Sequence, residues 1–335
     1  MTCFMDILLI AVLIVFLGLV FDYTNGFHDA ANVVATVIAT RVLAPVSAIV
    51  LAGILNTVGA LQMSRVAETI TSGIIETALA TPLTVLAGLV GAIIWNIFTW
   101  YIGMPSSSSY ALIGGLVGAS VMTSGFESIL WKGVFSKVII PMICSPFIGF
   151  FLAFLLMKSI SLFILRKKNG SGKEKVFSHL QIGSACVVAL AHGLNDAQKS
   201  MGLITLGLFS SGFLLNKQVP FWVIISCALV MGLGTATGGM RIIHTVGFSI
   251  TKLKPVQGFA AELSASVIIL LASFLGMPIS STHMMVGSVT GVGASDRFSS
   301  VRWSTIQRLI CVWVFSLPGS ALVGAFCSKG ILYFF

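Results

Sequence analysis

The sequence predicts an all-α, polytopic integral membrane protein made of two related halves. Three observations carry this prediction. Of the 335 residues, 57% are hydrophobic and only 9% are charged, and the mean hydropathy of +1.04 exceeds that of soluble domains. Stretches without any Asp, Glu, Lys or Arg recur along the chain. Finally, a pair of polar motifs occurs twice, in the same order.

The charge-free stretches are long enough to span a bilayer as helices. They cover residues 42–63, 77–126, 138–157, 218–240, 263–295 and 309–328. About 20 predominantly apolar residues cross the hydrocarbon core as a helix, because a helix satisfies its own backbone hydrogen bonds. The sequence shows none of the short alternating segments that are typical of an outer-membrane barrel. We therefore expect helices throughout.

The first apolar run, residues 7–21, is expected to lie in a membrane helix over residues 5–24. It lacks the basic n-region and the A-x-A cleavage site of a secretory signal. Six cysteines stand singly, mostly inside apolar runs and without a C-x-x-C pair. We interpret them as small buried hydrophobes rather than metal ligands.

The net charge of +9 is concentrated in a short segment. Five basic residues fall within 166-RKKNGSGKEK-175, between long apolar regions. The positive-inside rule makes this loop cytoplasmic in a cell-membrane protein, and it explains the charge without nucleic acid. Because the first forty residues contain no Lys or Arg, we expect the N-terminus on the opposite side. The linker, 166–177, separates a first repeat, 1–165, from a second, 178–335.

The first duplicated motif is 25-NGFHDAAN-32, whose counterpart is 191-AHGLNDAQKS-200. This alignment pairs Asp29 with Asp196. A carboxylate deep in hydrocarbon costs several kcal/mol unless a cation neutralises it, so the two acids imply either a proton or a hard metal ion held by oxygen ligands. The paired glycines of the motif are expected to permit an unwound backbone. The alternative is that each Asp only caps a helix break.

The second duplicated motif begins with a shared Gly-Met-Pro, in 103-GMPSSSSYALIGGLVGAS-120 and 276-GMPISSTHMMVGSVTGVGAS-295. A proline after glycine interrupts the incoming helix, so each motif predicts the tip of a re-entrant hairpin. The next helix starts there with unpaired N–H groups and a positive dipole end. Two facing tips, Ser106–Ser109 and Ser280–Thr282, would enclose one tetrahedral oxyanion. Alternatively, these serines only bond the carbonyl one turn back.

Further polar residues complete the predicted site. Asn32, Asn195 and Gln198 offer amide oxygens to a cation such as sodium. Glu262, with apolar neighbours on both sides, is a candidate coupling-ion ligand or proton carrier. Glu68 is either a second one or the partner of Arg65 in a local ion pair.

Several basic side chains adjoin the motifs. The histidines His28, His192 and His283 do not recur at equivalent positions of the repeat, so we interpret them as supporting donors. Lys199 follows Asp196 by three residues, which places both on one helix face. It either neutralises that Asp, attracts the anion, or snorkels to the membrane interface.

The two Asp motifs and the twin Gly-Met-Pro hairpins resemble the inorganic phosphate transporter (PiT) family, in its prokaryotic form with a short central loop. The resemblance covers nearly the whole chain and implies inverted-topology repeats with broken helices carrying the Asp motifs. It implies a site between the hairpin tips and the Asp motifs, lined by Asp29, Asn32, Asp196, Ser107, Ser108, Ser281 and Thr282. Combining the resemblance with the residue types above, we expect phosphate to be bound by Ser106, Ser107, Ser108, Ser280, Ser281, Thr282, Asn195 and Gln198, and the coupling ion by Asp29, Asn32, Asp196, Glu262 and Glu68. Within the latter, Asp29, Asn32 and Asp196 are the candidate sodium ligands.

The expected function is therefore a secondary symporter, which imports phosphate with sodium ions or protons by alternating access and is not an enzyme. No cofactor beyond the coupling ion is expected. A sulfate permease of the same family is the alternative, although an acidic side chain that accepts from the P–OH of phosphate favours phosphate. An intramembrane hydrolase using the two Asp or Ser281 with His283, and a passive channel, fit the duplicated motifs less well. The small residues Gly114, Gly115 and Gly118 pack helices within one chain or in a homodimer.

Overall fold

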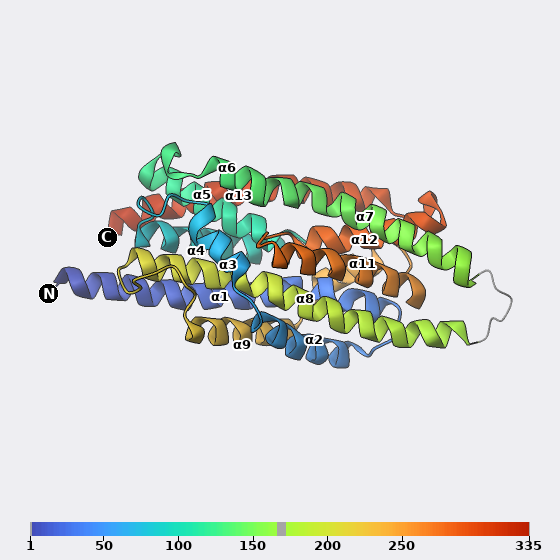
Figure 1. Ribbon diagram of the computed structural model, residues 1–335. Coiled ribbons are helices and arrows are strands. Elements are labelled where there is room, and N and C mark those ends of the chain that lie inside the picture. Colours follow the sequence, from blue (N-terminus) through green and yellow to red (C-terminus); the bar gives the residue numbers. More distant parts are fainter. Residues whose placement is uncertain (1, 166–171, 335) are drawn as a thin grey trace.

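A computed structural model describes residues 2–165 and 172–334, which are almost entirely helical (Figure 1). Within these residues, six helices are long and apolar enough to cross a membrane, or eight if each of two bent helix pairs forms one span. The all-α membrane prediction is confirmed. Residues 166–171 of the expected basic linker lie outside the described residues, and the last part of that linker is helical.

The two halves contain the same series of main helices. The first half comprises α1 (Thr2–Ala39), α2 (Pro45–Ala60), α3 (Arg65–Gly73), α4 (Pro82–Tyr101), α5 (Ser108–Ser124), η1 (Phe126–Ser128), α6 (Trp131–Gly133), η2 (Val134–Ile139), α7 (Ile140–Ile160) and η3 (Ser161–Leu165). The second comprises α8 (Lys173–Ser210), α9 (Phe221–Thr237), α10 (Met240–Phe248), α11 (Pro255–Phe274), α12 (Ser281–Asp296), η4 (Phe298–Ser300) and α13 (Trp303–Phe334). The segment from α6 to η3 in the first half takes the place of α13 in the second. Counterparts match closely in length, since α1 and α8 each have 38 residues and α4 and α11 each have 20.

The first long helices of the two halves, α1 and α8, run in opposite directions. In Figure 1, α1 starts at the left end of the bundle, whereas α8 starts at the right end and runs back beside it. The N-terminus and the helix ends that flank residues 166–171 therefore lie at opposite ends of the bundle. This is the arrangement that inverted-topology repeats require.

The expectation of broken helices at the Asp motifs is wrong, because α1 and α8 continue through them without interruption. Their glycines serve helix packing instead. A Cβ at Gly26 would lie 2.6 Å from the Met231 carbonyl oxygen, and one at Gly193 would lie 2.1 Å from the Asn56 carbonyl oxygen. Each glycine thus lets a helix of the other half approach closely.

The helix breaks occur elsewhere, at equivalent places in the two halves. The axes of α2 and α3 differ by 67°, and those of α9 and α10 differ by 70°. The second break coincides with Gly238, whose φ of +68° lies in the left-handed region that favours glycine. The short amphipathic helices that follow these breaks, α3 and α10, have nine residues each. Helix α3 packs against α8, and α10 packs against α1.

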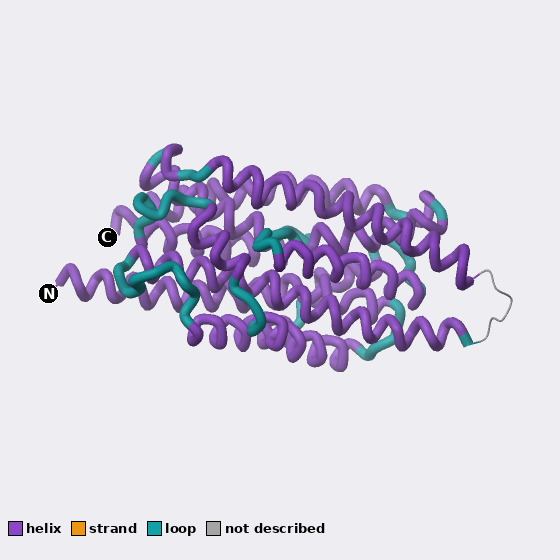
Figure 2. Tube along the Cα trace, viewed as in Figure 1, coloured by secondary structure: helices purple, strands orange, loops and turns teal. Residues whose placement is uncertain are grey.

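The Gly-Met-Pro segments form the two predicted hairpin turns, between α4 and α5 and between α11 and α12. Gly103 and Gly276 open the turns with φ of +69° and +67°. Helices α5 and α12 have 17 and 16 residues and are shorter than the about 20 residues of a typical span. The α11–α12 turn, orange in Figure 1 and teal in Figure 2, lies at mid-length of the bundle rather than at its end.

The short hairpin helices pack on long helices of the opposite half through glycine. A Cβ at Gly118 of α5 would lie 1.9 Å from the Ala321 carbonyl oxygen of α13. Its counterpart Gly291 of α12 faces the Phe150 carbonyl oxygen of α7 in the same way, at 2.2 Å. The predicted small-residue contacts of Gly114, Gly115 and Gly118 are therefore made within the chain, and they hold the hairpins in place.

Candidate functional site at the two hairpin tips

The two hairpin tips meet at the centre of the bundle, as the sequence predicts. Ser109 of the first tip donates a hydrogen bond to the Ile279 carbonyl oxygen of the second (3.1 Å). Each second helix begins in the same way, because the Ser107 hydroxyl accepts from Tyr110 N (3.3 Å) and the Ser280 hydroxyl accepts from His283 N (3.2 Å). These two serines are N-caps, and accepting leaves the hydrogen of each hydroxyl to donate elsewhere.

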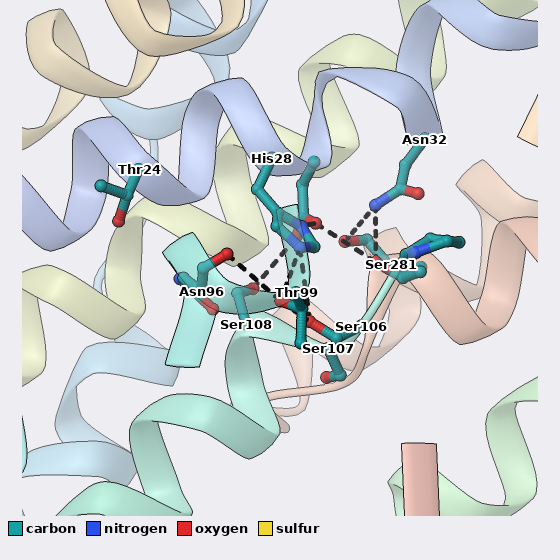
Figure 3. A network of polar contacts seen from close by, with 12 residues as sticks. Thr24, His28, Asn32, Asn96, Thr99, Ser106, Ser107, Ser108 and Ser281 are labelled. Carbon is teal, nitrogen blue, oxygen red and sulfur yellow. Dashed lines mark hydrogen bonds and ion pairs between the residues drawn. The ribbon is translucent and has the colours of Figure 1, made fainter. Parts of the chain in front are cut away.

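Asp29 of α1 is bound by both tips. Its carboxylate accepts from Ser108 Oγ of the first tip (2.9 Å) and from Thr282 Oγ1 of the second (3.3 Å). The neighbouring His28 Nδ1 lies 2.8 Å from Asp29 Oδ1. All four side chains are buried. Figure 3 shows His28 and Asn32 reaching from α1 toward the labelled serines of both tips.

Two further side chains join α1 to the hairpins. The other ring nitrogen of His28, Nε2, lies 3.2 Å from Thr99 Oγ1 and 3.3 Å from Ser106 Oγ. Asn32 Nδ2 donates to Thr282 Oγ1 (2.9 Å) and Ser281 Oγ (3.4 Å). The carbonyl oxygen of the Asn32 amide is buried without a hydrogen-bond partner. An unpaired buried oxygen is costly, so it marks a position where a cation or a water molecule is expected.

Asp196 of α8 occupies the equivalent position in the second half. It accepts from Ser281 Oγ (2.9 Å) and forms an ion pair with Lys199 Nζ (2.6 Å). His192 Nε2 lies 3.2 Å from Asp196 Oδ2, an ion-pair distance without hydrogen-bond geometry. The Lys199 side chain is completely buried, which argues against the snorkelling interpretation and leaves the other two, a partner for Asp196 and a group that attracts the anion.

The two aspartates lie close together. One ligand atom each from Asp29, His192 and Asp196 falls within 4.8 Å of the others. Two carboxylates at this separation repel each other unless positive charge lies between or beside them. Carboxylate and amide oxygens are the ligands that hard cations prefer, so the Asp29 carboxylate together with the Asn32 oxygen suits such an ion, while Asp196 already has the Lys199 ammonium beside it.

Two residues assigned to the substrate from the sequence also make structural contacts. Gln198 Oε1 accepts from Val66 N (2.7 Å) and Ala67 N (3.3 Å), so it caps the start of α3. Asn195 Nδ2 donates to Ser273 Oγ (2.8 Å) and thereby ties α8 to α11. The Asn195 carbonyl oxygen lacks a partner, whereas the Gln198 amide is fully engaged, since its Nε2 donates to the Leu194 carbonyl (2.6 Å).

The two candidate glutamates differ in position. Glu262 of α11 is fully buried and accepts from Thr36 Oγ1 (2.5 Å), Ser184 Oγ (2.5 Å) and Gln181 Nε2 (3.1 Å), which lie on α1 and α8. These donors are neutral and none belongs to a hairpin tip. Glu68 is exposed and accepts from Ser64 Oγ (3.1 Å), while Arg65 donates to the Phe274 carbonyl oxygen (2.8 Å).

Sequence reasoning missed three buried polar side chains near the site. Asp22 of α1 accepts from Ser200 Oγ (2.7 Å), and its second carboxylate oxygen has no partner. Asn25 and Asn96 are buried with both amide atoms unpaired. Two signals were available, because Asp22 precedes Asp29 by two helical turns and Asn96 is a lone amide in a charge-free helix.

Comparison with known proteins places these features in context. Residues 25–324 match the phosphate transporter family. The chain is 46% identical over 312 residues, 92% of its length and 93% of the relative's, to a "probable low-affinity inorganic phosphate transporter" of Rhizobium meliloti. It is 45% identical to a Bacillus subtilis protein of the same description, over 96% of this chain and 97% of that one. A solved structure described as "The sodium-dependent phosphate transporter" shares the fold, with a TM-score of 0.91 and 24% identity over 97% of this chain and 100% of that one.

Proposed function

Because the chain belongs to the phosphate transporter family, we propose that it is a secondary symporter that imports inorganic phosphate across the cell membrane together with a cation. The observation that carries this proposal is the convergence of both hairpin tips on Asp29 and Asp196 at the centre of the bundle. The family consists of transporters, which argues against the intramembrane hydrolase.

Phosphate binds between the tips in this proposal. Helices α5 and α12 both start there, so their first backbone N–H groups and positive dipole ends favour an anion. Ser107 and Ser280 retain hydroxyl hydrogens for phosphate oxygens. Phosphate also carries a proton at neutral pH, which Asp29 or Asp196 can accept as a hydrogen bond, whereas sulfate offers none.

The co-transported cation binds beside phosphate, at Asp29. An anion next to a buried carboxylate raises the electrostatic cost of both, and a shared cation lowers it. The unpaired Asn32 oxygen and the Asp29 carboxylate are its ligands in this proposal. The structural neighbour is described as sodium-dependent, which favours sodium over a proton as the ion here.

The antiparallel arrangement of the halves supports alternating access. The hairpins enter the bundle from opposite ends and meet at the tips, so a small displacement of one half against the other opens the centre to one end and then the other. The repeat boundaries at 1–165 and 178–335, the cytoplasmic position of the loop 166–175, and a homodimer stay predictions.

The test is uptake of radiolabelled phosphate into proteoliposomes that contain the purified protein, with imposed sodium or proton gradients. We expect saturable uptake that stops when the driving gradient is dissipated, with arsenate competing and sulfate not. Protein-free liposomes are the control. Uptake that sulfate blocks as well as phosphate would reassign the substrate, and uptake that increases linearly with concentration would indicate a channel.

A further inference from the structure

The repeat aligns Lys199 with Asn32, each three residues after its aspartate. We propose that Lys199 is a built-in cation, which permanently replaces a co-transported ion at Asp196, so that the mobile cation binds only in the Asp29 half of the site. This inference rests on the proposed symport of phosphate and deepens it, because it assigns the number of cations carried per cycle to one residue.

The Lys199 ammonium group lies against the Asp196 carboxylate. Lys199 Nζ lies 2.6 Å from Asp196 Oδ1, on the same face of α8, and the whole side chain is buried. An ammonium at hydrogen-bond distance from a carboxylate occupies the place where a metal ion would bind that oxygen. A lysine at the membrane interface would instead direct its charge to water.

The two aspartates differ in the charge of their neighbouring side chains. Each aspartate has one histidine within ion-pair distance, His28 for Asp29 and His192 for Asp196. Only Asp196 has a lysine in addition. At the equivalent place Asp29 has Asn32, whose amide carries no charge and whose oxygen is unpaired. A neutral oxygen ligand suits a mobile cation, whereas an ammonium excludes one by repulsion.

The centre of the bundle contains more acidic side chains than lysines. Asp22, Asp29 and Asp196 are all buried there, and Ser200, next to Lys199 in the chain, donates to Asp22 (2.7 Å). Lys199 is the lysine of this group, and His28 and His192 lie at ion-pair distance from Asp29 and Asp196. A bound phosphate adds further negative charge. Mobile cations must supply the positive charge that Lys199 does not supply, so removing Lys199 should increase the number of cations needed per phosphate.

The experiment measures the order of cation dependence in proteoliposomes. Initial rates of phosphate uptake are recorded against sodium concentration at fixed pH, and against pH without sodium, and the reversal potential gives the stoichiometry. The Lys199→Asn variant installs the residue of the first half. We expect the Hill coefficient for the cation to rise by about one, with uptake reduced at low and restored at high cation concentration.

Two further variants keep the test decisive if Lys199→Asn is inactive. The double variant Asp196→Asn/Lys199→Met removes both charges together, and we expect it to transport phosphate with the cation order of the unmodified protein, at a reduced rate. Lys217→Met removes a lysine that binds Thr77 away from the site and should change nothing.

Three outcomes would overturn the inference. The first is an unchanged cation order in Lys199→Asn accompanied by a higher KM for phosphate, which would make Lys199 a phosphate ligand. The others are a double variant that is inactive although it remains folded by size-exclusion chromatography, and a changed cation order in the double variant. If the unmodified protein itself takes up no phosphate, the proposed function fails instead. The two failures are thus distinguished by the unmodified protein alone.

Discussion

The Asp29 half and the Asp196 half of the site have the same backbone but different charges. In both, a long helix carries an aspartate that accepts from the serine hydroxyl of a hairpin tip, and a histidine that lies at ion-pair distance from that aspartate. Three residues further on, however, one half has the neutral Asn32 and the other the charged Lys199.

The two halves share the same type of close helix contact, whereas the charges of their polar side chains differ. Gly26 and Gly193 each admit a carbonyl of a crossing helix, and Gly118 and Gly291 do the same for the hairpins. A methyl group at any of them would overlap a backbone atom, which cannot move independently of its helix. Packing therefore constrains both halves alike, whereas the polar side chains of the two halves can contribute differently to binding the anion and the cation.

The largest effect is expected from Asp29→Asn, which removes the carboxylate that both tips bind. Removing one partner of a buried charge pair costs about 2–5 kcal/mol, so cation-driven phosphate uptake should fall at least about 30-fold. Proteoliposome uptake measures this, with Asp6→Asn as a control at an exposed position of the same helix. Cation-driven uptake that persists in Asp29→Asn would contradict the assignment of the mobile ion to this half.

A second prediction tests the packing that the halves share. In Gly193→Ala, the new methyl group would lie 2.1 Å from the Asn56 carbonyl oxygen. Overpacking of this kind costs about 1–3 kcal/mol, so the thermal unfolding temperature in detergent should fall by several degrees. Gly183→Ala is the matched control on α8, since nothing lies within 4 Å of its Cβ. Equal unfolding temperatures for the two variants would refute the packing role.

A third prediction separates the two glutamates. Glu262→Gln replaces an oxygen that accepts from hydroxyl and amide donors by an NH₂ group that cannot accept. Leaving a buried donor without its acceptor costs about 1–3 kcal/mol, so we expect phosphate uptake to fall about 5- to 150-fold. The control is Glu68→Gln, whose exposed side chain should tolerate the change. Comparable losses in both variants would argue against a special role for Glu262.

The smallest effect is expected from removing one tip hydroxyl. Ser108→Ala and Ser281→Ala each delete a donor to an aspartate. Each aspartate keeps another partner, Thr282 for Asp29 and Lys199 for Asp196, so the net loss should be that of one ordinary hydrogen bond, about 0.5–1.5 kcal/mol. The apparent affinities for phosphate or cation should therefore weaken about 2- to 10-fold. Ser264→Ala is the control, because the buried Ser264 hydroxyl has no hydrogen-bond partner. If Ser108→Ala alters the cation affinity more than Ser281→Ala does, the inequality of the halves is supported.

The sequence by itself determined the class of fold, the duplication and the hairpins. Apolar composition and charge-free length leave only helices in a bilayer, and Gly-Met-Pro interrupts a helix through local backbone restrictions that act wherever the segment lies. It also identified Asp29 and Asp196, because a buried acid stands out against apolar neighbours.

Only the tertiary structure decided how these parts combine. The glycines of the Asp motifs are compatible with an unwound segment and with a close helix crossing, and the choice depends on Met231 and Asn56, which are distant in sequence. For the same reason Gln198 became a cap for α3, and Lys199 became a buried partner of Asp196. Local sequence restricts the conformation of a segment, but the partner of a polar side chain is fixed by which helices cross beside it.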